Sequence, residues 1–460
     1  MNKLKPKYSL FTAVCLVVGI VVGTGVFFKA GNVLAEVNGN LMLSTLAWVI
    51  GGVIMVVSCY NFSTISLYKE NTNSLMDFAK VTCGKGFAYY VGVFAKYIYF
   101  PAMTATVSFV AGMYTCELFN LKGPSFPFSL PVFLLALSYL IFFATLNIIA
   151  PLIAGKFQIS TTIIKLIPLA LMAIGGIIVG LFNNTLVDNF QTGEIINTGN
   201  GFFAAICVTA FSYEGWICST NVGAEIKNKE TNLPKALIIG TMIVILIYIT
   251  YNLGISGAVS NNELITGSAS EVVKSAFSRL FGAAFGIILM IIVMISAIGT
   301  LNGLTMANSR NSYILASNNM GLFQEKLSKV NKRTNIPVSS SIIGLGFAVM
   351  WLLYYFYSQT HDLANGVGFP FSSDELPIIT TYGIYIPILI GLMIKGNGLN
   401  KFKRYVMPTM GIFAALFMIV ASIYRHRIYT LYYLTFVAVV MLIAFLIDKL
   451  IVSRNRDILS

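Results

Sequence analysis

A glycine-rich stretch near the amino terminus holds backbone groups that could bind both charges of a small zwitterion. Residues 17–28 are apolar enough to enter a bilayer, yet they place Gly-Thr-Gly in the middle of the run. Each glycine costs a helix about 1 kcal/mol relative to alanine, so a helix over these residues is weakest there. A helix that opened at this point would direct amides towards an anion and leave carbonyls for a cation. The residues that would supply these groups are Ile20, Val21, Gly23, Thr24, Gly25 and Val26.

The same stretch also has a purely structural interpretation. Gly19 and Gly23 have the spacing that lets two membrane helices pack closely. An opened backbone is tolerated in hydrocarbon only where it lines a cavity or meets a ligand. Taken alone, this stretch supports helix packing and ligand binding about equally.

A second apolar run is interrupted in a similar way. Residues 203–216 place a carboxylate and a glycine, Glu214 and Gly215, inside an otherwise apolar segment. A charge at the bilayer centre costs about 2.5–3.5 kcal/mol on insertion scales. Two interrupted helices five spans apart predict inverted repeats with a binding site between them, and together they favour ligand binding over packing. The second interruption adds the candidate substrate-binding residues Phe211, Ser212, Tyr213 and Glu214.

The composition predicts an integral membrane protein. The chain has 460 residues, 57% of them hydrophobic and 10% charged, with a mean hydropathy of +0.81. Runs of about 20 apolar residues, each crossing a bilayer, explain these values more directly than a soluble core does. The net charge of +13 does not indicate nucleic-acid binding, because the basic residues fall in short loops between apolar runs. Lys3, Lys5 and Lys7 precede a run that lacks a cleavage site, so we interpret that run as the first span and not as a signal peptide.

The apolar runs predict an all-α membrane fold of about twelve transmembrane helices. With the amino terminus inside, most of the 30 Lys and Arg residues fall in inner segments, which places both termini in the cytoplasm. Short loops predict a single domain over 1–460, with a first repeat at 9–182, an inverted second repeat at 201–394 and two additional helices at 404–452. The inner connection over 314–336 could include a short surface helix. The predicted spans are 9–34, 41–68, 86–114, 129–149, 157–182, 201–224, 235–258, 279–313, 337–358, 376–394, 404–424 and 428–452.

No residue pattern indicates a metal site or a cofactor. The six cysteines lie in or beside apolar runs without metal-ligand spacing, and His361 and His426 are isolated. A phosphate-binding Gly-x4-Gly-Lys-Ser/Thr loop is absent from the sequence, so transport driven by ATP is not expected.

Five motifs in order resemble those of the amino acid–polyamine–organocation transporters, and most closely those of the L-type amino acid transporters and their bacterial exchangers. The resemblance implies a LeuT-type fold of ten core helices in two inverted repeats, with helices 1 and 6 broken, plus two more helices. It also implies that the substrate carboxylate meets the first break and the ammonium group meets carbonyls of both breaks. The motifs are Gly23-Thr24-Gly25-Val26-Phe27, residues 211–216, residues 223–228 with 232–236, residues 165–169 and residues 299–303.

The resemblance further implies a role for a lysine in the fifth span. Lys165 lies about 12 Å into its span, where a lysine either snorkels to the interface or has a partner. In several sodium-independent relatives a fifth-helix lysine stands where others hold sodium, so the matching Lys165 implies sodium independence. By analogy, Tyr248 is expected to link to Lys165 or to the substrate carboxylate. Glu214 departs from the family pattern and could favour a cationic side chain, respond to protons or stabilise the break, whereas Lys96 is expected to snorkel.

These observations predict a secondary transporter of L-amino acids in the cytoplasmic membrane that works by sodium-independent exchange and alternating access. Its partners are then the free amino acid and the lipid bilayer, and the sequence carries no signal for or against an accessory single-span subunit. The alternatives are a proton-coupled symporter or antiporter of amino acids or polyamines, in which Glu214 or the Lys165 amine would be the titrating group, and, more remotely, an intramembrane enzyme. Small neutral or bulky apolar substrates are favoured, followed by cationic ones because of Glu214.

Overall fold

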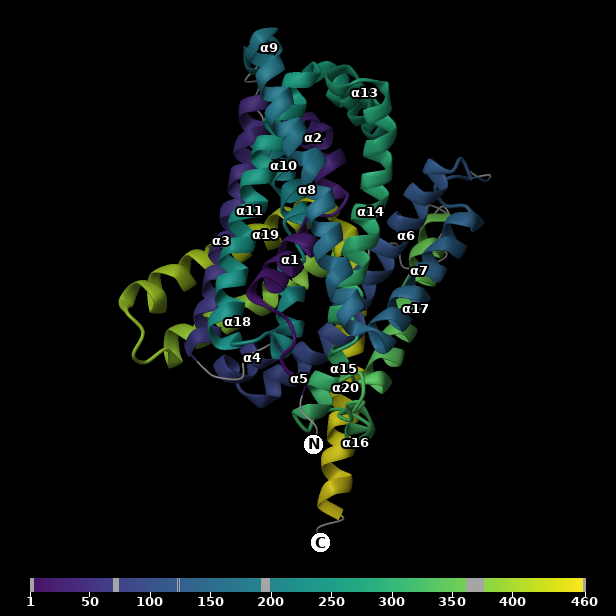
Figure 1. The fold of residues 1–460 in the computed structure, drawn as a ribbon. Coiled ribbons are helices and arrows are strands. Elements are labelled where there is room, and N and C mark those ends of the chain that lie inside the picture. Colours follow the sequence, from purple (N-terminus) through teal and green to yellow (C-terminus); the bar gives the residue numbers. More distant parts are fainter. Residues whose placement is uncertain are drawn as a thin grey trace.

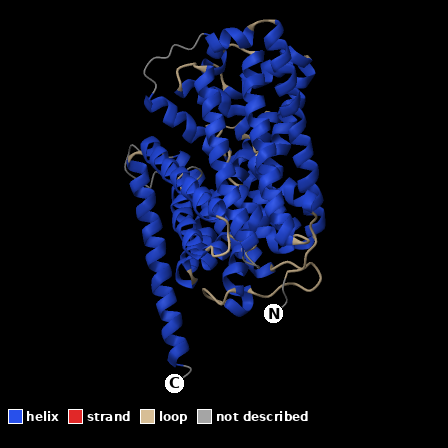
Figure 2. Ribbon diagram, turned by 90° about the vertical axis from the view of Figure 1, so that its left-hand side faces the viewer, coloured by secondary structure: helices blue, strands red, loops and turns tan. Residues whose placement is uncertain are grey.

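The computed structural model describes residues 4–68, 74–121, 123, 125–191, 199–360 and 376–457. Lys3 and His361, both considered above, lie outside the described residues. Over these ranges the regular secondary structure is helical, and one isolated bridge pairs Tyr8 with Ile226. The predicted all-α class is therefore confirmed, and Figure 2 shows the helical bundle from the side.

Ten helices of the described chain are long and apolar enough to cross a membrane, and each coincides with a predicted span. The remaining two predicted spans are the interrupted ones. The first consists of α1 (Leu10–Val21) and α2 (Gly25–Glu36), which are bent by 43° at their junction, and the sixth consists of α10 (Gly199–Ser212) and η2 (Trp216–Glu225). The continuous spans are α3 (Leu41–Tyr68), α5–η1–α6 (Lys85–Phe94, Ala95–Tyr99, Phe100–Leu118), α7 (Leu130–Ile149), α8 (Pro151–Phe182), α11 (Lys229–Ala258), α14 (Ala283–Asn308) with α15 (Asn311–Ser317), α17 (Val338–Thr360), α18 (Pro377–Lys395), η4–α19 (Phe402–Val406, Met407–His426) and α20 (Ile428–Asp457).

Short helices connect several spans. They are α4 (Leu75–Cys83), α9 (Thr185–Gln191), α12 (Asn261–Thr266), α13 (Ala269–Phe281) and α16 (Gln324–Leu327). The last confirms the expected short helix in the inner connection. The eighth span begins at Ala283 and not at residue 279, because Gly282 takes a positive φ of 96° and separates it from the amphipathic α13.

The broken helices lie at the centre of the bundle. α1 (Leu10–Val21) packs against α8, α11, α14 and η2 (Trp216–Glu225), while α10 (Gly199–Ser212) packs against α3 and α2 (Gly25–Glu36). Figure 1 shows α1 and α2 surrounded by these longer helices. Large apolar side chains such as Phe142, Leu181 and Phe413 remain exposed on the outside of the bundle, where a membrane would cover them.

The first described residues and the carboxyl end of α20 lie at the same end of the bundle, which we call the terminal face (Figures 1 and 2). This arrangement agrees with an even number of spans. The predicted repeats at 9–182 and 201–394 remain an interpretation of the span pattern.

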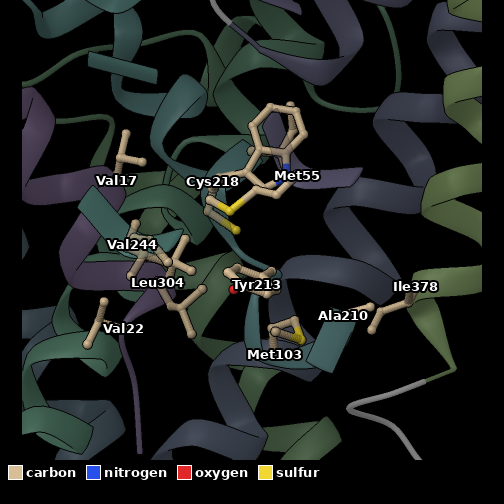
Figure 3. Close-up of a cluster of buried hydrophobic side chains, with 14 of the residues drawn as sticks. Val17, Val22, Met55, Met103, Ala210, Tyr213, Cys218, Val244, Leu304 and Ile378 are labelled. Atoms are coloured by element: carbon tan, nitrogen blue, oxygen red, sulfur yellow. The ribbon is translucent and has the colours of Figure 1, made fainter. Parts of the chain in front are cut away.

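Close backbone approach holds α8 and α11 together. A β-carbon on Gly254 would stand 2.2 Å from the Met172 carbonyl oxygen, and one on Gly176 would stand 2.0 Å from that of Gly254. The hydrophobic effect does not drive helices together inside a membrane. Close contacts between small residues are what allow them to associate. The core beside them contains side chains from several elements, and Figure 3 shows Val17 of α1, Val244 of α11, Leu304 of α14 and Tyr213 in one buried cluster.

Candidate functional site

The first span opens over three residues. α1 ends at Val21 and α2 begins at Gly25, with Thr24 at the N-cap position. Residues 23–25 are partly exposed, whereas Val22 and Val26 on either side are buried. The first amides of α2 have no acceptor within their helix, and the last carbonyls of α1 have no donor within theirs. The predicted opening at Gly-Thr-Gly is therefore present, with exposed backbone at its centre.

The carbonyl end of α1 receives the side chain of Lys165, which is completely buried. Its Nζ lies 2.8 Å from the Gly19 oxygen and 2.6 Å from the Val22 oxygen. On the other side it lies 3.3 Å from the Ser296 carbonyl and 3.1 Å from Thr300 Oγ1, both in α14. All four ligands are neutral oxygens, the kind of shell that a small cation takes. Lys165 thus has partners, and it does not snorkel.

The helix-packing interpretation of Gly19 also holds. A β-carbon there would stand 2.3 Å from Thr162 Oγ1 and 2.4 Å from Gln158 Nε2, so α1 and α8 could not approach as they do. Gly23 has more room, since the nearest atom to its β-carbon position, Thr300 Oγ1, is 3.6 Å away. The two glycines therefore have different roles. Gly19 permits close packing of α1 and α8, and Gly23 lies in the break.

The sixth span opens at residues 213–215. α10 ends at Ser212, and η2 continues as a 3₁₀-helix from Trp216. Gly215 between them has φ 101°, a left-handed conformation that a β-carbon disfavours, and a β-carbon would also approach Ile20 Cγ2 to 3.1 Å. Ile20, predicted to bind substrate through its backbone, packs its side chain against this turn.

The two breaks face one another. A β-carbon on Gly25 would lie 3.6 Å from Ser212 Oγ. The hydroxyl of Tyr248 lies 2.9 Å from the Val21 carbonyl oxygen and 3.0 Å from that of Ser212, so it stands between the carbonyl ends of both broken helices. The described contacts of Tyr248 do not include Lys165, one of its two expected partners.

Glu214 is buried beside the second break. Its Oε1 accepts a 2.6 Å hydrogen bond from the hydroxyl of Tyr99 in η1, and the amide of Gly215 also donates to its carboxylate. The ion pairs of the described residues do not include Glu214. Buried carboxylates normally have a cation or accept several hydrogen bonds, so this group is an unusual feature at membrane depth.

The other predicted residues of this motif have different surroundings. Tyr213 donates a 3.0 Å hydrogen bond to the Trp48 carbonyl, and its ring packs against Tyr248 and Trp48 with centroid separations of 4.9 and 5.9 Å. These contacts make Tyr213 part of the support for Tyr248. The side chain of Phe211 lies outside the described part of the structure.

Sequence reasoning missed a charged cluster that joins the segment before α1 to η2 and to Arg310 between α14 and α15. Glu225, at the end of η2, accepts a 2.8 Å hydrogen bond from Arg310 Nε, and both side chains are fully buried. Lys7 pairs with the second carboxylate oxygen of Glu225, and burial lowers the pKa of Lys7 while Glu225 opposes that shift. Glu225 was visible as an acid at the end of an apolar run, but only the fold brings it to Arg310.

Backbone hydrogen bonds reinforce the junction between the segment before α1 and the end of η2. Tyr8 and Ile226 form the parallel bridge, in which the amide of Tyr8 donates to the Glu225 carbonyl at 2.9 Å and the amide of Lys227 donates to the Tyr8 carbonyl at 2.8 Å. The segment before α1 is therefore fastened across the end of the second broken helix. Among the described residues, no group of three or more His, Cys, Asp and Glu side chains could hold a metal ion.

Comparisons with known proteins show the family of the chain and a solved structure of similar fold. A sequence model of the amino acid permease family matches residues 8–445. The serine/threonine exchanger SteT of Bacillus subtilis (strain 168) is 29% identical over 408 residues, which cover 88% of this chain and 87% of that protein. The cystine/glutamate transporter of Homo sapiens is 24% identical over 92% of this chain and 81% of that protein. The crystal structure of MhsT in complex with L-phenylalanine has a similar fold, with a TM-score of 0.57 and 16% identity over 96% of this chain and 100% of that one.

Proposed function

The chain belongs to the amino acid permease family of membrane transporters, and we propose that it exchanges L-amino acids across the cytoplasmic membrane without sodium. Family membership sets aside the intramembrane enzyme considered from the sequence. The observation that carries the proposal is the pair of opened helices whose polar backbone ends face each other at the centre of the bundle.

An amino acid fits this pair of breaks by its charges. Its carboxylate would accept hydrogen bonds from the amides of Gly25 and Val26 at the start of α2, where the helix dipole also favours an anion. Its ammonium group would bind the carbonyl oxygens at the ends of α1 and α10. These carbonyls belong to Val21 and Ser212, which Tyr248 now bridges, so the hydroxyl holds the two acceptors at a separation suited to one donor group.

The position of Lys165 supports transport without sodium coupling. Its side-chain nitrogen occupies a shell of four neutral oxygens from α1 and α14, so it fills the position where a bound cation would otherwise be needed. A group that is covalently attached cannot leave with the substrate as a sodium ion does. Transport by such a site would not draw on a sodium gradient, and exchange of one amino acid for another is the transport mode that fits best.

Alternating access would open the terminal face, which the distribution of basic residues assigns to the cytoplasm. In the structure this face is closed by Lys7, Glu225 and Arg310. Breaking these contacts would free the segment before α1 from η2 and let the first and sixth spans move apart. The proposal therefore places both termini in the cytoplasm.

Neutral amino acids are the proposed substrates, with L-serine and L-threonine as the first to test because SteT is named for them. The buried Glu214 carboxylate supports this choice in a limited way, because it can accept a hydrogen bond from a side-chain hydroxyl. No accessory subunit is part of the proposal.

Counterflow in proteoliposomes tests the proposal. Purified protein is reconstituted with unlabelled L-serine inside, and entry of labelled L-serine is followed with sodium or choline outside. We expect rapid counterflow that is the same in both cations and that is absent from liposomes without internal amino acid. Uptake that requires sodium, or that proceeds equally well without internal substrate, would contradict it.

A proton-coupled transporter of amino acids or polyamines is the second candidate, because Glu214 is buried at membrane depth without a described ion pair. A pH gradient imposed on liposomes without internal substrate would then drive accumulation of labelled amino acid or putrescine. Exchange without such accumulation favours the first proposal.

A further inference from the structure

A large cavity lies apart from the site between the broken helices. It has a volume of about 570 Å³ and lies between the α5–η1 segment, α15, α16, α17 and α20. This volume is within the range of small-molecule sites. The described residues that line it are predominantly apolar and aromatic, and among these Lys96 carries the single charge.

Lys96, which the sequence predicts to snorkel, lines this cavity. It is 9% exposed, its Nζ donates a 3.0 Å hydrogen bond to the Tyr97 hydroxyl, and the same atom lies 4.6 Å from the centroid of the Tyr97 ring. The ion pairs of the described chain do not include it. An ammonium group has three donors, and Tyr97 satisfies one, so the others are available to an anion in the cavity.

The backbone around Lys96 is irregular and held in place. Residues Ala95–Tyr99 form a π-helix within the third span, a feature often found at functional sites. The indole Nε1 of Trp351 in α17 donates a 2.8 Å hydrogen bond to the Tyr97 carbonyl. On the other wall, the Tyr89 hydroxyl donates a 3.0 Å hydrogen bond to the Ala444 carbonyl of α20. Hydrogen bonds between helices thus fix two walls of the cavity.

The cavity reaches below the membrane surface. Its lining includes Gly321 and Leu322 in the connection at the terminal face, and also Val440 in α20. Val440 precedes Asp448, where the apolar run of α20 ends in the sequence, by about 12 Å along the helix. A large hydrated headgroup belongs at the interface and not at this depth, whereas a single carboxylate paired with Lys96 could be held there.

We propose that this cavity binds one long-chain fatty acid anion, with its carboxylate on Lys96 and its hydrocarbon chain against the apolar walls. One negative charge matches the one cation among the described lining residues, and their apolar side chains match an alkyl chain. The site is separate from the amino acid site and does not depend on the proposed exchange.

Trp351 provides a direct test, because it lines the cavity and is only 7% exposed. A dibrominated stearate, whose bromines quench indole fluorescence on contact, is titrated into the detergent-purified full chain. We expect saturable quenching that disappears in Trp351→Phe, which leaves Trp48 and Trp216 as the remaining tryptophans. In Lys96→Met the apparent Kd should rise roughly 10-fold, as for the loss of a charge-assisted hydrogen bond.

Matched controls separate binding from misfolding. Lys156→Met removes a charge from an exposed position in α8 and should leave the Kd unchanged, while Lys96→Arg should restore binding relative to Lys96→Met. The methyl ester of the same brominated acid should bind more weakly and without dependence on Lys96. Quenching that does not saturate, that keeps the wild-type Kd in Lys96→Met, or that arises only with a brominated anionic phospholipid would overturn the proposal. Amino acid counterflow by the same preparations shows that the variants are folded. If the wild-type protein binds the fatty acid but shows no counterflow, the proposed transport function is wrong and the fatty acid site stands.

Discussion

The Lys165 ammonium group lies 2.6 Å from the carbonyl oxygen of Val22, 143 positions earlier in the chain. This contact joins the fifth span to the last carbonyls of the opened first span. An unpaired carbonyl at membrane depth is costly, and so is an unpaired lysine, so each group compensates the other. The break in the first helix and the buried lysine are therefore two parts of one feature.

Lys165→Met should reduce the initial rate of amino acid counterflow at least 10-fold, because it removes hydrogen bonds from a charged donor to buried carbonyls. Lys156→Met, on the exposed side of the same helix, is the matched control and should transport normally. Rates are measured in proteoliposomes with equal amounts of protein, with and without sodium. If Lys165→Met shows counterflow at the wild-type rate, Lys165 has only a structural role.

Tyr248→Phe should weaken substrate binding, because the Val21 and Ser212 carbonyls lose the hydroxyl that positions them for the substrate ammonium group. A hydrogen bond contributes about 0.5–1.5 kcal/mol, so we expect KM for counterflow to rise roughly 2- to 12-fold. Tyr251→Phe is the control, since that hydroxyl donates to the Phe27 carbonyl within α2, away from the carbonyl ends of both breaks. Equal effects of the two substitutions would argue against a specific role for Tyr248.

Glu225→Gln should shift the protein towards a conformation that is open at the terminal face. It removes the charge that compensates buried Arg310, and breaking a buried ion pair costs about 3–5 kcal/mol. The measurement is the rate at which a maleimide labels Cys218, a fully buried residue of η2, in a variant that retains only this cysteine. We expect labelling to accelerate at least 10-fold. Glu230→Gln, at an exposed position nearby, should leave the rate unchanged.

Glu214→Gln distinguishes exchange from proton coupling. The amide oxygen of glutamine can still accept the hydrogen bond from Tyr99, so the second break should keep its shape. For an exchanger we expect counterflow of neutral amino acids within about 3-fold of wild type, because the change is close to isosteric. A pH gradient should drive no accumulation in either protein. If the gradient drives accumulation in wild type and not in Glu214→Gln, the proton-coupled alternative replaces the exchange proposal.

Gly254→Val should destabilise the protein without touching the transport site. The added side chain would collide with the Met172 carbonyl of α8, and overpacking of this kind costs about 1–3 kcal/mol or more. The midpoint of thermal unfolding, followed by size-exclusion chromatography after heating, should fall by several degrees. Gly346→Val is the control, because a β-carbon at Gly346 meets nothing within 4 Å. A midpoint equal to that of wild type would show that α8 and α11 can move apart at little cost.

Most of the fold could be predicted from the sequence because membrane spans are long and apolar. The interruptions at residues 22–24 and 213–215 were also visible, since glycines and a carboxylate stand out in hydrocarbon. The start of the eighth span was misjudged, because the amphipathic α13 precedes it after only a one-residue turn at Gly282. Local hydropathy reports how apolar a segment is and not the direction in which its helix runs.

The sequence by itself determined that this chain crosses a membrane many times and that two of its crossings are opened where backbone groups can meet a ligand. Only the tertiary structure decided what the isolated polar side chains do. It placed Lys165 against the carbonyls of α1 and paired Glu225 with Arg310. It also packed Tyr213 against Tyr248 and placed Lys96 in the lining of a cavity. The reason is physical: a polar group in hydrocarbon must find a partner, but the spacing of residues along a helix gives its depth and not the neighbouring helix that it faces.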